Sequence, residues 1–178
     1  NSGGDWEFFG PTLTKEELLA KGSTLGIYQE SIDVSSYPDG EYEIRAVTYC
    51  DLGANYTPAV AGKIDRQSAV LYGIPTPANG ILTKSDVISV AYNKEIRNDG
   101  KTPINVSLID VDTNQEIPAT AVVNGKSIEI KTVDAGILDQ LENHFLIAKV
   151  WNVIDDASGN LASDTVAWEF VINRSNVF

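Results

Sequence analysis

Short segments in which apolar residues alternate with polar ones constrain the fold of this chain more than any other feature. Five segments have this pattern: residues 41–46, 87–92, 104–108, 127–131 and 166–172. Successive side chains of a β-strand point to opposite faces of the sheet, so a period of two indicates strands with one buried face. The pattern therefore predicts an all-β fold.

Turn sequences separate these segments at short intervals. They are Pro38-Asp39-Gly40, Ala78-Asn79-Gly80, Asn98-Asp99-Gly100, Asn124-Gly125 and Ser158-Gly159-Asn160. The Asn124-Gly125 pair, between Val123 and Lys126, predicts a two-residue hairpin turn because both residues tolerate a positive φ. Many short strands with such turns between them are typical of a β-sandwich or a barrel.

Helical patterns are scarce. Residues 14–22 contain the clearest one, in which Thr14 can cap a short helix and Gly22 can end it. Glu17 follows the cap by three residues, as in a capping box. A second helical turn is predicted over residues 134–141, where it would lie in a crossover between two sheets.

The chain divides near residues 65–67, because one strand pattern ends before this point and a new apolar strand follows it. We expect one module over residues 1–66 and another over residues 67–178. The second contains about seven strand candidates, the number that an immunoglobulin-like sandwich needs. The first contains about four or five. We therefore expect it to be incomplete at its N-terminus or to be completed by a partner.

Several motifs of the second module resemble those of one protein family. They are residues 75–80, with two prolines and Asn-Gly, residues 89–96, residues 153–160, with an Asp-rich Gly-Asn turn, and residues 168–172, a Trp-x-Phe strand. Together they resemble the bacterial Ig-like domains that occur as repeats in surface-layer proteins, adhesins and large secreted proteins. Tyr92 stands where that family usually has phenylalanine.

Residues 37–47 look like the penultimate strand of a fibronectin- or Ig-like module, in which Tyr42 is placed to form a tyrosine corner. The two resemblances imply immunoglobulin-like β-sandwich modules in tandem, at an extracellular or cell-surface location. They imply a spacer, stalk or adhesive role, with neighbouring modules of the same parent chain as partners. The family carries no catalytic residues that could be transferred to this chain.

The charge balance limits the partners. The chain has 25 acidic and 13 basic residues and a formal net charge of −12. Such a surface repels phosphate groups and anionic lipid, so we expect no nucleic-acid partner and no membrane insertion. No apolar run approaches the roughly 20 residues of a membrane-spanning helix. The chain starts at Asn1 and contains no methionine, which we interpret as a piece of a longer protein.

Residue types that support catalysis are few. His144 is the single histidine, which argues against a catalytic triad and favours a structural imidazole. Cys50 ends an apolar strand pattern, so we expect a small buried side chain. No catalytic or cofactor-binding residue is predicted, and we expect that the protein is not an enzyme. A carboxylate pair for glycoside hydrolysis stays open, because the fold sets the separation of such pairs.

Two clusters of oxygen-bearing side chains are weak candidates for calcium: Asp110, Asp112 and Asn114 in one, and Asp155, Asp156 and Asn160 in the other. Alternating oxygen ligands are typical of calcium loops, although the first cluster lacks the glycine and distal glutamate of an EF-hand. Aspartate and asparagine are also common in turns, and both clusters lie where turns are expected. A plain turn is therefore the alternative for each, and no other metal or cofactor is predicted.

Four aromatic residues could form a platform for stacking sugars: Trp6, Tyr28, Tyr56 and Trp151. Aromatic residues in sandwiches more often fill the core, as we expect for Trp168. The leading hypothesis is a non-catalytic structural or adhesive segment that contacts another protein or a glycan. The alternatives are an accessory, carbohydrate-binding module of a secreted polysaccharide-degrading enzyme, and an assembly subunit completed by a donor strand.

Overall fold

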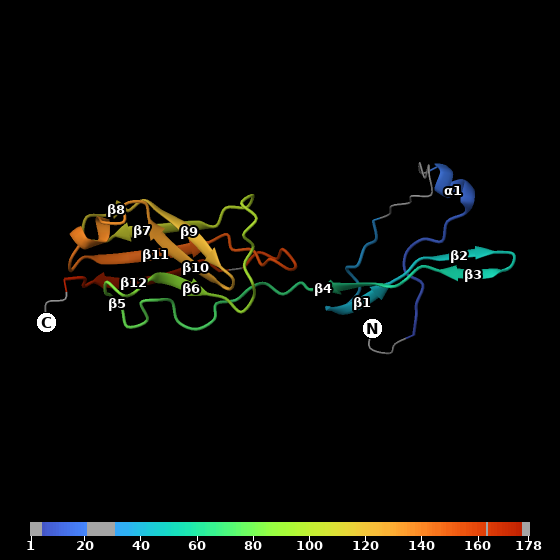
Figure 1. Ribbon diagram of the computed structural model, residues 1–178, viewed down its shortest axis with the longest axis horizontal. Helices are drawn as coiled ribbons and strands as arrows, with labels where there is room; N and C mark the ends of the chain where they lie inside the picture. The colour runs from blue at the N-terminus through green and yellow to red at the C-terminus, as the bar shows by residue number, and fades with distance from the viewer. Residues whose placement is uncertain (1–4, 21–30, 163, 176–178) are drawn as a thin grey trace. The chain divides into compact units, whose positions relative to one another are not determined.

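The computed structural model describes residues 5–20, 31–162 and 164–175 of the chain. It divides into two compact units, Asn1–Asp65 and Arg66–Phe178, one residue before the expected boundary. Figure 1 draws the first unit in blue to teal and the second in green to red. Strands are the main regular structure in both units, which confirms the prediction of an all-β chain with a short helix near its N-terminus.

The helix of the first unit, α1 (Lys15–Ala20), has the predicted capping box. The backbone N–H of Glu17 donates to Oγ1 of Thr14 at 3.3 Å, and the backbone N–H of Thr14 donates to Oε2 of Glu17 at 2.7 Å. These reciprocal bonds satisfy backbone donors that the first turn of a helix leaves unpaired. The expected helix end at Gly22 lies outside the described residues.

The strands of the first unit form one long antiparallel hairpin, visible in Figure 1 as the teal ribbon. In chain order they are β1 (Gly40–Ile44), β2 (Val47–Cys50), β3 (Gly53–Tyr56) and β4 (Val60–Ile64). The inner pair is β2–β3 and the outer pair is β1–β4. A bond from the N–H of Thr57 to the carbonyl of Ala46, 3.0 Å long, connects the two pairs.

The Ig- or fibronectin-like module expected over residues 1–66, incomplete at its N-terminus or completed by a partner, stays a prediction, because the described residues form this hairpin alone. Among the described residues of the first unit, no residue is buried and no second sheet packs against the hairpin. Cys50 is exposed, not buried as predicted, because no second layer covers the end of β2. The alternating pattern at residues 41–46 correctly located β1, but it does not supply a sheet that would cover the apolar face of this strand.

The tyrosine corner expected in this unit is confirmed. The hydroxyl of Tyr42 donates to the backbone carbonyl of Pro38 at 2.7 Å. The Tyr42 ring also contacts that of Tyr37 edge to face, with 6.1 Å between ring centroids, and Tyr37 contacts Phe9 in the same way at 5.0 Å. These contacts hold the chain that enters β1 against the start of the strand.

The described residues of the second unit form eight strands and a 3₁₀ helix. In chain order they are β5 (Ile81–Leu82), β6 (Ile88–Ala91), β7 (Asn105–Asp110), β8 (Gln115–Glu116), β9 (Ala119–Asn124), β10 (Ser127–Thr132), η2 (Ile137–Gln140), β11 (Phe145–Trp151) and β12 (Val166–Ile172). One sheet has the order β6-β10-β9 and the other β5-β12-β11-β7-β8. All pairs are antiparallel except β5–β12, which is parallel. The predicted helical turn is confirmed as η2, in the crossover between the two sheets.

The two sheets share one hydrophobic core. The three-stranded sheet contributes Ile88 and Ile130, among others, and the five-stranded sheet contributes Leu108, Leu146 and Phe170, all in one cluster of buried residues. Burying a side chain of this kind contributes about 1.5–3 kcal/mol. The alternation read from the sequence therefore identified the inward faces correctly in this unit.

Trp168 packs against this core, and its Nε1 donates to the carbonyl of Thr76 at 3.0 Å. The predicted core position of Trp168 is thus found at the edge of the cluster, where the indole N–H reaches a backbone acceptor. This bond connects β12 to the segment that enters the unit.

The turn between β9 and β10 differs from the prediction by one residue. Asn124 pairs with Ser127, so the two turn residues are Gly125 and Lys126 and not Asn124 and Gly125. Gly125 has φ +62° and Asn124 stays outside the left-handed region. A turn with glycine at its first central position needs a positive φ at that residue only, whereas the predicted turn needs it at two.

Candidate functional site

The turn between β7 and β8 contains the first of the two predicted calcium clusters, Asp110, Asp112 and Asn114. Asp110 is buried and its Oδ1 accepts the backbone N–H of Asp112 at 3.1 Å, while Oδ2 accepts the hydroxyl of Thr113 at 2.7 Å. Asn114 has φ +55°, in the left-handed region, and completes the turn before β8. The segment is therefore a hydrogen-bonded turn, as the alternative interpretation expected.

His144 adds an imidazole to this turn. Leu146 of β11 pairs with Asp110 of β7, and this register places His144, at the entrance of β11, beside the buried carboxylate. Its Nδ1 lies 3.0 Å from Oδ2 of Asp110 and 4.0 Å from Oδ2 of Asp112. One ligand atom from each of the three side chains lies within 4.8 Å of the others. The sequence analysis assigned His144 a structural role and did not connect it with the aspartates.

Electrostatics at this turn favour the charged form of Asp110. Burial raises the pKa of its carboxyl, but hydrogen bonds from Thr113, His144 and Asp112 lower it by more. The net result is a pKa below the ordinary value of 3.8. Asp110 is therefore a buried, ionised carboxylate at neutral pH.

In the second calcium candidate, hydrogen-bond donors of the turn itself occupy both oxygens of the Asp155 carboxylate. Asp155 is fully buried, and its Oδ1 accepts the N–H and Oγ of Ser158, both at 2.7 Å. The N–H of Gly159 reaches the same oxygen at 3.2 Å, and the N–H of Asn160 reaches Oδ2 at 3.1 Å. Lys94 lies 3.9 Å from the carboxylate. Donors and a cation therefore surround Asp155, which favours the turn interpretation.

The other two members of this cluster point to the same interpretation. Asp156 is exposed, and the side-chain amide of Asn160 donates to the carbonyl of Gln67 and to Oγ of Ser158, both at 3.0 Å. The amide nitrogen of Asn160 thus faces the turn and the chain that enters the unit. Both contacts stabilise the loop itself.

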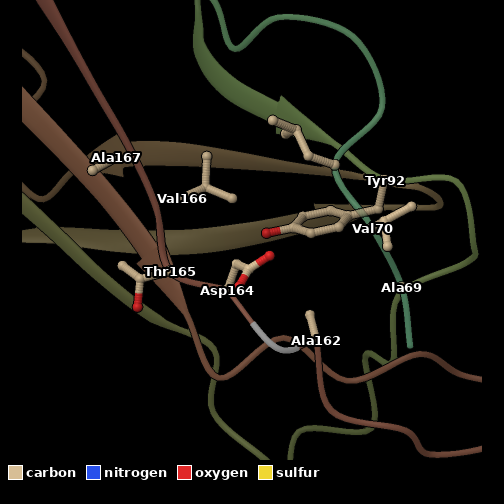
Figure 2. Close-up of a pocket in the computed structure, with 9 residues that line it drawn as sticks. Ala69, Val70, Tyr92, Ala162, Asp164, Thr165, Val166 and Ala167 are labelled. Carbon is tan, nitrogen blue, oxygen red and sulfur yellow. The ribbon is translucent and has the colours of Figure 1, made fainter. Parts of the chain in front are cut away.

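A small cavity opens beside Tyr92, with a volume of about 260 Å³. Figure 2 shows the Tyr92 ring pointing into this space, which is lined by Ala69 and Val70 of the segment that enters the unit and by residues 164–167 at the start of β12. The Tyr92 hydroxyl is buried without a hydrogen-bond partner, and burial raises its pKa to about 12. The walls are mainly apolar, although Asp164 and Thr165 also line the cavity.

A second cavity, of about 450 Å³, lies beside Trp151, Pro103 and Val106. Among the residues that line the two cavities, Asp164 is the single carboxylate. Neither cavity therefore brings together the carboxylate pair that glycoside hydrolysis needs.

Of the predicted aromatic platform, the structure brings Trp6 and Tyr56 together around one guanidinium. The guanidinium of Arg45 stacks over the ring of Trp6 at 3.8 Å and that of Tyr56 at 4.4 Å. Trp151 belongs to the other unit, and Tyr28 lies outside the described residues. Arg45 thus covers one face of the Trp6 ring and one face of the Tyr56 ring. The sequence spacing did not reveal this cation–π arrangement.

The fold and these sites define a two-unit, all-β protein whose second unit has two sheets around one core. Within the described part of the chain, no helix has the length and apolar character needed to cross a membrane. No family model, no curated protein and no solved structure matches this chain.

Proposed function

We propose that this chain is a non-catalytic structural or adhesive segment of a large secreted or cell-surface protein, with an immunoglobulin-like sandwich in its second unit. The strand order carries the proposal. Immunoglobulin-type sandwiches pair their second, fifth and fourth strands in one sheet and their third, sixth and seventh in the other. Numbered from β5 as the first strand and with β8 as an added edge strand, the sheets β6-β10-β9 and β12-β11-β7 have this order.

The surface charge and the two acidic turns are consistent with this role. The net charge of −12 disfavours nucleic acid and anionic lipid as partners. The acidic turns at Asp110 and Asp155 are held by internal hydrogen bonds, as expected for loops that maintain the shape of a scaffold.

The test is the size and location of the parent protein in its native source. An antibody raised against residues 66–178 should detect a very large chain that is accessible to protease on intact cells or present in the medium. A chain of modest size with one catalytic domain would support the accessory-module alternative. A protease-resistant chain inside the cell would contradict the proposal.

A second candidate function is an assembly subunit whose first unit is completed by a strand from a neighbouring copy. The observation that favours it is the exposed apolar face of the outer strand pair, β1–β4. Ile44 and Val60 are cross-strand partners on one face of β1–β4, and they are 48% and 68% exposed. A two-stranded hairpin is marginally stable in water, and strand addition at a sheet edge is a common mode of association.

Hydrogen exchange at several protein concentrations tests this candidate. If neighbouring copies complete the hairpin, the amides of β1 and β4 become protected as the concentration rises and light scattering shows a growing mass. Ile44→Asp should remove both effects, whereas Glu43→Lys, on the opposite face, should leave the association intact. A monomer at all concentrations would exclude this candidate while leaving the immunoglobulin-like proposal for the second unit intact.

A further inference from the structure

The cluster of Asp110, Asp112 and His144 has an arrangement that a turn alone does not require. Three ligand atoms from two separate elements, the β7–β8 turn and the start of β11, lie within 4.8 Å of one another. We propose that these three side chains bind a divalent transition-metal ion of the zinc class, and not calcium.

The charges in this cluster are not balanced by a lysine or an arginine. Within the described residues, His144 is the sole ion-pair partner of Asp110 and of Asp112. Other carboxylates of the same unit have such a partner, since Asp155 has Lys94 and Asp139 has Arg174. Two neighbouring carboxylates repel one another unless a positive charge lies between them, so a bound cation stabilises this arrangement.

The donor set selects the class of ion. Calcium takes six to eight oxygen ligands, whereas zinc takes about four ligands and accepts imidazole nitrogen together with carboxylate oxygen. Metal–ligand bonds of about 2.0–2.2 Å place the ligand atoms of one tetrahedral ion about 3–4 Å apart. Nδ1 of His144 lies 3.0 Å from Oδ2 of Asp110, in a hydrogen bond that a bound ion would replace, and 4.0 Å from Oδ2 of Asp112, and both separations agree with that range.

The site is held in place and yet open to solvent. Oδ2 of Asp112 accepts the backbone N–H of Phe145 at 2.8 Å, which ties the turn to β11, and Thr113 orients the carboxylate of Asp110. Such outer hydrogen bonds orient metal ligands and support their affinity. The side chains of Asp112 and His144 are 48% and 32% exposed, so an ion can enter and water can complete its coordination.

Nuclear magnetic resonance of the untagged 178-residue chain gives a direct test, because His144 is its single histidine. After dialysis against a chelator, the protein is titrated with zinc chloride and, separately, with calcium chloride. We expect zinc to shift the imidazole signals and to saturate at one equivalent. Asp112→Asn, which keeps a side-chain oxygen to accept the N–H of Phe145, should weaken zinc binding by about 10-fold or more. The matched control Asp156→Asn, an exposed aspartate outside the cluster, should bind zinc as the wild type does.

Three results would overturn the proposal. Imidazole signals that zinc does not move would leave the cluster as a hydrogen-bonded turn only. Equal zinc affinity in Asp112→Asn and wild type would place the ion elsewhere on this acidic surface. Saturable calcium binding that Asp112→Asn weakens, without a response of the imidazole to zinc, would assign the turn to oxygen ligands alone.

Discussion

Replacing Asp155 by alanine should destabilise the second unit more than any other single change in a loop. The carboxylate is fully buried and accepts four hydrogen bonds, two of them 2.7 Å long and from Ser158. A hydrogen bond to a charged group contributes about 1.5–3 kcal/mol. The exposed Ser158 regains water once the carboxylate is gone, so the losses do not add fully. We expect a loss of about 3 kcal/mol in the free energy of unfolding.

The assay is urea unfolding followed by tryptophan fluorescence, with Asp156→Ala as the matched control. Both variants remove one negative charge from adjacent positions, but the control changes an exposed side chain. We expect the control to unfold within about 0.5 kcal/mol of the wild type. If Asp155→Ala is equally close to the wild type, the buried turn does not contribute to stability and the reasoning is refuted.

The same carboxylate predicts a pH dependence. Burial raises the pKa of Asp155, but hydrogen bonds from Ser158 and the charge of Lys94 lower it by more, so the folded-state pKa lies below 3.8. A depressed pKa contributes stability that is present above the unfolded-state value and is lost as the pH falls through the folded-state value. The stability difference between wild type and Asp155→Asn should therefore be constant near neutral pH and shrink below about pH 4. A difference that grows in acid would contradict this sign.

Two further substitutions and one labelling experiment test the fold. Phe170→Ala removes a ring that is 2% exposed, and should cost about 3–5 kcal/mol in urea unfolding; a loss below about 1.5 kcal/mol would contradict its place in the core. Tyr42→Phe removes the bond to Pro38 and should speed amide exchange in β1, by an amount that corresponds to about 1 kcal/mol. Unchanged exchange would show that the tyrosine corner does not stabilise the hairpin. Cys50 should react with a thiol reagent in the native protein nearly as fast as in urea, because its side chain is exposed; a protected thiol would indicate that another layer covers the end of β2.

The sequence predicted the second unit well because its strands have one apolar face each. Residues 127–131 alternate strictly and large apolar residues recur at every second position of 166–172, and Ile128, Ile130 and Phe170 are buried as this period of two requires. The same pattern at residues 41–46 located β1 correctly. Alternation shows that a strand has an apolar face, but it does not show whether a second sheet covers that face, so the bare hairpin was not predicted.

The cluster of Asp110, Asp112 and His144 was only half predictable, because it depends on the register of two strands. Asp110 and Asp112 are two residues apart, and their spacing alone suggested an ion site. His144 follows them by more than thirty positions, and the pairing of β7 with β11 decides that it lies beside them. That register depends on which apolar side chains meet in the core, and a single sequence does not specify it.

The parallel pairing of β5 with β12 has a consequence for a chain that is pulled at its ends. The carbonyl of Gly80 accepts the N–H of Val171 at 2.9 Å, and the carbonyl of Leu82 accepts that of Asn173 at 3.0 Å. β5 is the first strand of the second unit and β12 the last, so tension along the chain slides these two strands past each other. Their bonds then carry the load together in shear, whereas an antiparallel hairpin pulled at its open end loses its bonds one at a time. Since forced unfolding is governed by the unfolding rate, we expect these few bonds to set how long the unit survives under load.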